Sequence, residues 1–349
     1  MSFEKKILVN KNIVISENSK TFIIAEIGSN HNQSFQQAKK LILQAKKCGA
    51  DAVKFQSLNL TETIHSDEIN ETTKKLYKKI SLNENWYKKL NNFSKKNKII
   101  FFSTPTYSRS VKILSKLKVP IYKIASTNFG FNPKIDIEIA KQNKPILIST
   151  GLVTTDEATN YLKNISNYNK KIILLHCISR YPTLDFEANL GNIRKLKEQF
   201  DCLVGFSDHT MSTDIPAYAV AAGARVIEKH FTLSKSHKGP DHFYALNPKE
   251  FSEMCIKIRK MEAILNLNSN LKKFKKEEIA YKKYFKLKIF SNKDLKKGQR
   301  VNSKNLVGLI NTKNKGIDCR EIFKLKSFIC KKNIKKNTLL EWKNLIKKK

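Results

Sequence analysis

The chain has 349 residues, of which 40% are hydrophobic, and a formal net charge of +37 at pH 7. This length can bury a large core and suits one large domain followed by a smaller one. No segment reaches the roughly 18 consecutive apolar residues of a membrane span, and the start of the chain carries charges and Asn where a secretory signal has an apolar segment. We therefore expect a cytoplasmic protein without a membrane partner.

Cysteine and lysine usage argues against two further classes of protein. The six cysteines stand far apart without a C-x-x-C pair, so neither a disulfide framework nor a zinc knuckle is indicated. Only seven of the 67 basic residues are Arg, the residue that nucleic-acid readers use for bidentate contacts. Residues 271–349 hold 26 Lys or Arg against six acidic residues, but scattered Lys is typical of solvated helix faces, so we do not expect nucleic-acid binding.

From residue 22 onward, short β-branched or aromatic runs alternate with amphipathic helical stretches. The expected strands are 22–26, 52–56, 99–103, 121–125, 145–149, 172–176, 202–207 and 225–230. A helical stretch follows each of them, for example 34–49, which Gly49 would close, and 155–165, which Thr155 would begin. Eight consecutive β/α units in about 245 residues predict an α/β fold of the (β/α)8 TIM-barrel type, with a doubly wound sheet as the alternative.

A second, smaller unit is expected after a helix rich in Lys and Glu at about 248–283. We divide the chain into a barrel domain at 1–270, a linker at 271–283 and a C-terminal domain at 284–349. Within the last, residues 292–307 resemble 331–346 with a shift of 39 residues. Two similar halves indicate a small domain with pseudo-twofold symmetry.

The expected strands end on polar residues, and TIM-barrel enzymes place their catalytic side chains at the C-terminal ends of strands. His209 and His230 end the seventh and eighth strands, which would be neighbours in a barrel. With Asp208 and Glu228 beside them and Asp241 soon after, the two histidines predict a shared divalent cation with open positions for substrate and water. The alternative is a pair of hydrogen-bonded surface histidines.

Lys54 and Lys123, on the second and fourth strands, would face the same mouth and hold a phosphate or carboxylate among neighbouring hydroxyls. Lysines that reach solvent at the barrel rim are the structural alternative. Lys123 also suits a Schiff-base aldolase, although that mechanism leaves the histidine pair without a role. Glu26, at the end of the first strand, is the candidate acid/base residue if burial raises its pKa.

Eight segments in order resemble the N-acetylneuraminate (sialic acid) synthase family, which also includes legionaminate, pseudaminate and spore-coat sugar synthases. They are AEIGSNHNQSFQQAKKLILQAKKCGADAVKFQ, FFSTPTYS, VPIYKIAS, KPILISTG, LLHCISRYPT, VGFSDHT, VIEKHFTL and GPDH. The match covers about 22–265, and residues 284–349 resemble the family's antifreeze-like (SAF, β-clip) domain. The resemblance therefore agrees with the barrel and gives a reason for the internal repeat.

The resemblance implies a transferase that condenses phosphoenolpyruvate with an N-acylated amino-hexose in its open aldehyde form. The products would be a nine-carbon 2-keto acid and phosphate, with Mn or Mg as the divalent metal. In that chemistry the aldehyde is polarised, the enol carbon attacks, water adds to the oxocarbenium, and phosphate leaves with C–O cleavage. The family also implies a homodimer in which the SAF domain of one subunit closes the barrel mouth of the other. A non-catalytic sugar- or nucleic-acid-binding protein is the alternative of another class.

The family's functional positions have matching residues in this chain. His209 and His230 match the metal ligands, and Glu26 matches the acid/base residue. The positions that contact phosphoenolpyruvate match Lys54, Thr104, Lys123, Ser126, Ser149 and Ser207. The positions assigned to the rest of the substrate site match Gln56, Ser179, Tyr181 and Asp241.

Three positions depart from the family's pattern, all at its sugar end. Asn128 stands where many members have an acid, Ala245 where many have Ser, and Thr312-Lys313-Asn314 where the SAF domain has Arg-Pro-Gly. We therefore expect Lys313 or Lys315 to make any sugar contact from the SAF domain. We also expect a deoxygenated, di-N-acylated hexose rather than plain N-acetylmannosamine as the substrate.

Overall fold

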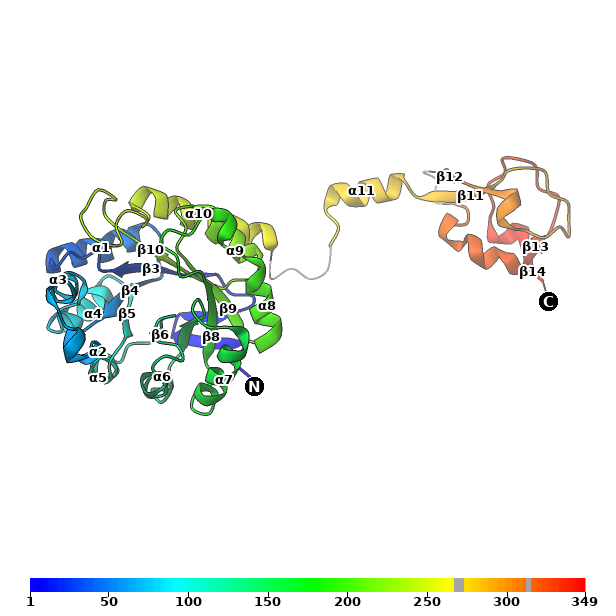
Figure 1. The fold of residues 1–349 in the computed structure, drawn as a ribbon. Helices are drawn as coiled ribbons and strands as arrows, with labels where there is room; N and C mark the ends of the chain where they lie inside the picture. The colour runs from blue at the N-terminus through cyan, green and yellow to red at the C-terminus, as the bar shows by residue number, and fades with distance from the viewer. Residues whose placement is uncertain (267–272, 312–314, 349) are drawn as a thin grey trace. The chain divides into compact units, whose positions relative to one another are not determined.

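The computed structural model describes residues 1–266, 273–311 and 315–348, and the chain divides into two compact units, 1–268 and 269–349 (Figure 1). The departure at Thr312-Lys313-Asn314 lies outside the described residues. The two units are described separately below.

The first unit is built around eight parallel strands (Figure 1). They are β3 (Phe22–Gly28), β4 (Ala52–Ser57), β5 (Ile100–Pro105), β6 (Tyr122–Ile124), β7 (Ile146–Ser149), β8 (Ile172–Cys177), β9 (Leu203–Asp208) and β10 (Val226–His230). Their order is β5-β4-β3-β10-β9-β8-β7-β6, so the first and last strands of the series pair with each other. The predicted barrel is confirmed and the doubly wound alternative is wrong, because the strands follow one another around the ring in chain order.

Helices surround the strands (Figure 1). They are α1 (Phe35–Lys47), α2 (Leu60–Thr63), α3 (Glu71–Ile80), α4 (Trp86–Lys96), α5 (Ser108–Lys116), α6 (Pro133–Ala140), α7 (Thr155–Ser166), α8 (Gly191–Phe200), α9 (Ile215–Ala221) and α10 (Pro248–Leu265), with short 3-10 helices at Ser66–Glu68 and Asp185–Glu187. Gly49 follows α1 with φ of +101°, as expected of a residue that ends a helix. α7 begins at Thr155, as expected, and Thr154 caps it, because its hydroxyl accepts from the backbone N–H of Glu157.

An antiparallel hairpin precedes the barrel and was not predicted from the sequence. It joins β1 (Lys6–Asn10) to β2 (Ile13–Ser16), and the side chain of Asn10 accepts from the backbone N–H of Ile13 in the turn. Ile7 and Ile15 are fully buried in the barrel core. The hairpin lies at the N-terminal ends of the strands, since the backbone of Glu4 bonds to that of Lys170, just before β8.

The second unit begins with α11 (Lys276–Tyr284). It continues with β11 (Leu287–Ser291), β12 (Leu306–Ile310), β13 (Phe328–Cys330) and β14 (Leu345–Lys347), and with 3-10 helices at Ser303–Asn305, Cys319–Ser327 and Trp342–Asn344. The expected continuous helix over 248–283 is wrong, because α10 ends where Asn266 takes a left-handed conformation with φ of 46°. β11 pairs with β12, and β13 pairs with β14, both antiparallel.

The two halves of the internal repeat are joined by reciprocal hydrogen bonds. Leu295 and Ile334, which are 39 positions apart, each donate a backbone N–H to the other's carbonyl at 2.8 Å. A second pair of bonds obeys the same relation, since Lys297 N donates to Asn333 Oδ1 and Lys336 N donates to Asp294 Oδ1. Equivalent positions therefore meet across a pseudo-twofold axis, as the repeat predicted.

Among the helices within the described residues, none is both long enough and apolar enough to cross a membrane.

Candidate active site

The C-terminal ends of the barrel strands surround a cavity of about 330 Å3. Of the predicted site residues, twelve line this cavity: Glu26, Lys54, Gln56, Thr104, Lys123, Ser126, Ser149, Ser179, Tyr181, Ser207, His209 and His230. The exception is Asp241, which does not line the cavity and whose carboxylate accepts from the Ser29 hydroxyl at 2.8 Å. The barrel therefore brings together residues that are up to 204 positions apart in the sequence.

Strand alternation decides which side chains reach the cavity. On β10, Glu228 and His230 line the cavity. Lys229, between them, extends to the other face of the strand and forms an ion pair with Asp208. The acid next to His209 and the lysine next to His230 are therefore not part of the cavity wall, although the sequence places them beside its two histidines.

Two lysines and two carboxylates form a buried cluster at the base of the cavity. Lys54 Nζ lies 2.8 Å from Glu26 Oε2 and 3.5 Å from Glu228 Oε1. Lys123 Nζ lies 3.3 Å from the same Glu228 oxygen, which also accepts from the Ser207 hydroxyl. Sequence reasoning noted Glu228 beside the histidine but did not assign it to the site. Its position on the same strand as His230, two residues earlier, was the signal that it faces the cavity.

Burial and mutual attraction set the ionisation of this cluster. Burial raises the pKa of Glu26, and this effect outweighs the lowering by Lys54. For Glu228, burial also acts to raise the pKa, but the two lysines prevail and hold it below its usual value. Burial lowers the pKa of Lys123 despite its contact with Glu228. Of the two carboxyls, that of Glu26 is the one with a raised pKa, which is the condition that the sequence analysis set for an acid/base residue.

Hydroxyl groups surround the lysines with available hydrogen-bonding capacity. Lys54 donates to Thr104 Oγ1 at 3.1 Å, and Ser126 Oγ accepts from the backbone N–H of Gly151. The buried hydroxyl oxygens of Ser149 and Ser179 find no hydrogen-bond partner in the part of the chain that the structure describes. Buried polar atoms are normally satisfied, so these hydroxyls point to a bound group with several oxygens.

His209 and His230 face each other with ring centroids 5.5 Å apart. Burial, reinforced by the neighbouring His230, lowers the pKa of His209 to about 3, and burial lowers the pKa of His230 to about 4. Both rings are therefore neutral at pH 7, the state in which imidazole binds a metal.

Hydrogen bonds determine which nitrogen of each ring is available. His209 Nδ1 lies 2.7 Å from the carbonyl of Ile178, to which it donates, so its Nε2 keeps a free lone pair. His230 Nδ1 lies 3.4 Å from the hydroxyl of Tyr244, which itself donates to Asp241. That hydroxyl can accept from His230, and Nε2 of this ring is then free as well.

These donors fit a divalent cation held by two imidazoles, with the remaining positions left to water and substrate. Within the described residues, no group of three or more His, Cys, Asp or Glu side chains has the arrangement of a metal site. The two imidazoles are the candidate ligands, and Asp241 is linked to His230 through the Tyr244 hydroxyl.

The outer part of the cavity is uncharged. Its partly exposed lining residues include Leu58, Asn128, Leu152 and Tyr181, and the Tyr181 ring packs on His209 with centroids 4.1 Å apart. Asn128 Oδ1 is buried without a hydrogen-bond partner in the described part of the chain. Ala245 is fully buried and does not line the cavity, so the expectation that this departure lies at the sugar end is wrong.

A family model described as the NeuB family matches residues 41–270. The chain belongs to this family. It is 38% identical over 301 residues to an N,N'-diacetyllegionaminic acid synthase of Campylobacter jejuni, covering 82% of this chain and 89% of the relative. It is 34% identical over 300 residues to a pseudaminic acid synthase of the same species, covering 82% and 86%.

A solved structure agrees with these relatives. The crystal structure of an N-acetylneuraminic acid (sialic acid) synthetase from Leptospira borgpetersenii is similar with a TM-score of 0.75 and 31% identity, covering 81% of this chain and 98% of that chain. The predicted membership of the sialic acid synthase family is confirmed, and the NeuB relatives are synthases of nonulosonic acids.

Proposed function

We propose that this chain is a nonulosonic acid synthase that joins phosphoenolpyruvate to an N-acylated amino-hexose and releases phosphate. The observation that carries the proposal is a single cavity with two buried lysines at its base and a pair of neutral histidines at its wall. The lysines suit an anionic substrate, and the histidines suit a carbonyl substrate. The two substrates would meet between them.

The anionic substrate belongs at the lysine side. Lys54 and Lys123 provide positive charge, and the unpaired hydroxyls of Ser149 and Ser179 can donate to phosphate or carboxylate oxygens. Glu228 keeps the two lysines oriented and balances part of their charge. Thr104, Ser126 and Ser207 complete the polar surface around them.

Glu26 is placed to hold and move the proton. Its carboxyl accepts from Gln56 Nε2 at 2.7 Å and contacts Lys54, and burial raises its pKa. A carboxyl with a raised pKa can take a proton from an attacking water and return it to a product oxygen. Gln56 and Lys54 fix the direction in which the two carboxyl oxygens point.

His209 and His230 would hold the divalent cation, Mn or Mg, through Nε2. When bound, such a cation supplies Lewis-acid polarisation of the aldehyde oxygen of the sugar. Tyr181, which packs on His209, would cover the open side of this region and exclude part of the bulk water.

The sugar would occupy the uncharged outer part of the cavity. Leu58 and Leu152 suit methyl groups, and the Asn128 amide can both donate to and accept from an acylamino group. These residues favour a deoxygenated, di-N-acylated hexose over a phosphorylated sugar, because the four charged residues of the cavity are gathered at its base. The relative at 38% identity is named for a diacetylated product.

We further propose a homodimer in which the C-terminal unit acts as the SAF domain and closes the mouth of the partner's barrel. An oxocarbenium needs a controlled supply of water, and Tyr181 at the mouth is half exposed. Lys313 or Lys315 is the candidate for a contact between this unit and the sugar.

Release of phosphate tests the proposal. We expect phosphate from phosphoenolpyruvate only when a divalent cation and a diacetamido-trideoxyhexose or N-acetylmannosamine are both present. A Schiff-base aldolase is the second candidate, because burial lowers the pKa of Lys123 toward the range of a nucleophilic amine. Borohydride trapping separates the two: covalent labelling of Lys123 with substrate supports the aldolase, and its absence together with phosphate release supports the synthase.

A further inference from the structure

Lys229 is buried on the side of β10 that faces away from the active-site cavity. Its side chain is 1% exposed. Its Nζ donates to Asp208 Oδ2 at 2.5 Å, to the Thr210 carbonyl at 2.5 Å and to the Thr210 hydroxyl at 3.2 Å. No step of the proposed reaction uses this lysine, which leaves its burial unexplained.

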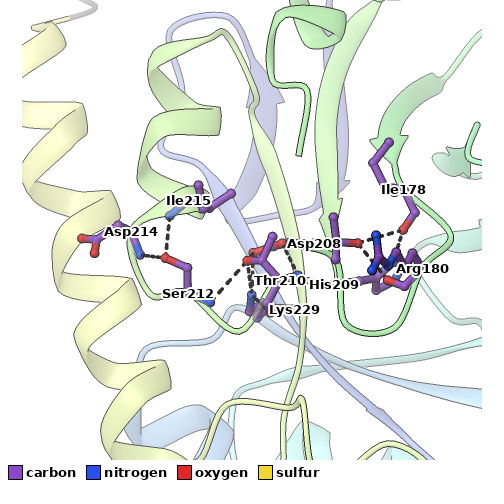
Figure 2. A network of polar contacts seen from close by, with 10 residues as sticks. Ile178, Arg180, Asp208, His209, Thr210, Ser212, Asp214, Ile215 and Lys229 are labelled. Carbon is purple, nitrogen blue, oxygen red and sulfur yellow. Dashed lines mark hydrogen bonds and ion pairs between the residues drawn. The ribbon is translucent and has the colours of Figure 1, made fainter. Parts of the chain in front are cut away.

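The contacts of Lys229 join the ends of two neighbouring strands (Figure 2). Asp208 and Thr210 stand immediately before and after His209, and Lys229 stands immediately before His230. One ammonium group therefore joins the residue on each side of His209, through the Asp208 carboxylate and the Thr210 carbonyl, to the strand that carries His230. We call the contacts of Lys229 with Asp208 and Thr210 the clamp. Because side chains alternate along strands, the clamp lies behind the cavity wall while the two imidazoles face the cavity.

The network continues in two directions from this clamp (Figure 2). Asp208 Oδ1 accepts from the backbone N–H of Thr210, and the Thr210 hydroxyl accepts from the backbone N–H of Ser212. The Ser212 hydroxyl in turn accepts from the backbone N–H of Ile215, the first residue of α9. On the other side, the carbonyl of Ile178 fixes the His209 ring. The position of His209 is thus tied both to the neighbouring strand and to the following helix.

The buried ion pair between Lys229 and Asp208 is not explained by a gain in folding stability alone. Two charges lose their hydration on burial, and an apolar pair of similar volume often stabilises a fold as well as a buried ion pair does. An ion pair differs from an apolar pair in its demand for a particular geometry. That demand matters most where two metal ligands must keep a fixed separation.

We propose that Lys229 is a positioning residue that, together with Asp208 and Thr210, sets the separation and orientation of His209 and His230 for a shared divalent cation. The proposal rests on the metal assignment of the proposed function. Residues behind metal ligands typically change metal affinity by about 10- to 100-fold when they are removed.

The test measures Mn(II) binding to the full chain by the loss of the free-ion electron paramagnetic resonance signal, and thermal unfolding in parallel. Lys229→Met leaves the Asp208 carboxylate buried without its partner, so it should lower both the melting temperature and the affinity. The double variant Asp208→Asn, Lys229→Met removes both charges and keeps an acceptor for the Thr210 N–H. We expect it to regain most of the melting temperature but to bind Mn(II) about 10- to 100-fold more weakly than the unaltered protein.

Arg225 provides a matched control at the other end of β10. It is also buried, at 5% exposure, and its guanidinium donates to the carbonyls of Glu17 and Ala224. Arg225→Met should lower the melting temperature without changing Mn(II) affinity. Wild-type affinity in the double variant, or an equal loss of affinity in Arg225→Met, would overturn the role of Lys229. If the unaltered protein itself does not bind Mn(II), the metal assignment fails, and the positioning role fails with it.

Discussion

Lys123 and Glu228 form a buried ion pair, with 3.3 Å between Nζ and Oε1, although their strands, β6 and β10, are not neighbours in the barrel. The same carboxylate oxygen lies 3.5 Å from Lys54. One acid therefore joins two lysines across the barrel interior, and this relation organises the base of the cavity.

Replacement of Glu228 by Gln should damage both stability and turnover. The change leaves Lys123 and Lys54 partly uncompensated in a buried site, a loss that typically costs about 3–5 kcal/mol of the free energy of unfolding. We expect kcat/KM for phosphate release to fall by at least about 100-fold, because the lysines lose their orientation. Denaturant unfolding and the phosphate assay measure the two effects. Glu71→Gln, which breaks the exposed pair with Lys74, is the control and should cost less than about 1 kcal/mol.

Turnover should require a divalent cation bound by His209 and His230. Chelation is expected to abolish phosphate release and Mn to restore it, because both rings are neutral and present a free Nε2. The double variant His209→Ala, His230→Ala should remain inactive at any Mn concentration, whereas replacement of the exposed His65 by Ala should have no effect. Near-normal activity of the double variant would contradict the metal assignment.

Asn128 should contribute to the choice of sugar. Its neutral amide at the cavity suits an acylamino group, and a carboxylate there would suit hydroxyls instead. We expect kcat/KM to be higher for diacetamido-trideoxyhexoses than for N-acetylmannosamine. Asn128→Asp should lower the ratio of these two kcat/KM values by about 10-fold, which corresponds to one altered hydrogen bond. A preference for N-acetylmannosamine in the unaltered protein would refute this assignment.

Asp136 should make stability depend on pH. Burial raises its pKa from 3.8 to about 7, although the backbone N–H of Gly130 donates to it at 3.0 Å. Between pH 4 and 7 the unfolded chain releases this proton while the folded chain keeps it, so the free energy of unfolding falls as pH rises and levels off above pH 7, after a loss of about 4 kcal/mol at most.

The variant Asp136→Asn removes that titration. Its melting temperature should equal that of the unaltered protein near pH 4 and be higher at pH 8. The difference in melting temperature should grow between these two pH values. The control Glu68→Gln, at an exposed position, should change the free energy of unfolding by no more than about 0.5 kcal/mol at either pH. Equal melting temperatures of Asp136→Asn and the unaltered protein at pH 8 would show that the pKa of Asp136 is not raised in the folded state.

Mixed subunits should reveal a lid provided in trans. A chain truncated after residue 270 has a barrel without a C-terminal unit, and a full-length His209→Ala chain has that unit but an inactive barrel. Co-expression should restore phosphate release if each barrel is closed by the partner subunit, as we propose. A mixture as inactive as either parent alone would argue for closure within one chain.

Much of the fold could be predicted because parallel barrel strands are buried on both faces and therefore appear as continuous apolar runs. All eight expected strands are present, with bounds that differ by one or two residues. The hairpin over β1 and β2 was missed, although alternating apolar residues on either side of Asn10 were a usable signal. The break between α10 and α11 was also missed, because a single Asn in a left-handed conformation ends the helix.

The sequence by itself determined the barrel, the mouth at its strand ends and the identity of most cavity residues, since these depend on local periodicity and on ordered family motifs. Only the tertiary structure decided which partner each charged side chain takes. Glu228 and Lys229 are adjacent in the chain, yet one bonds to Lys123 across the cavity and the other to Asp208 behind it. Strand alternation assigns them to opposite faces, but their partners come from other strands, and the distance between strands is set by barrel closure rather than by the local sequence.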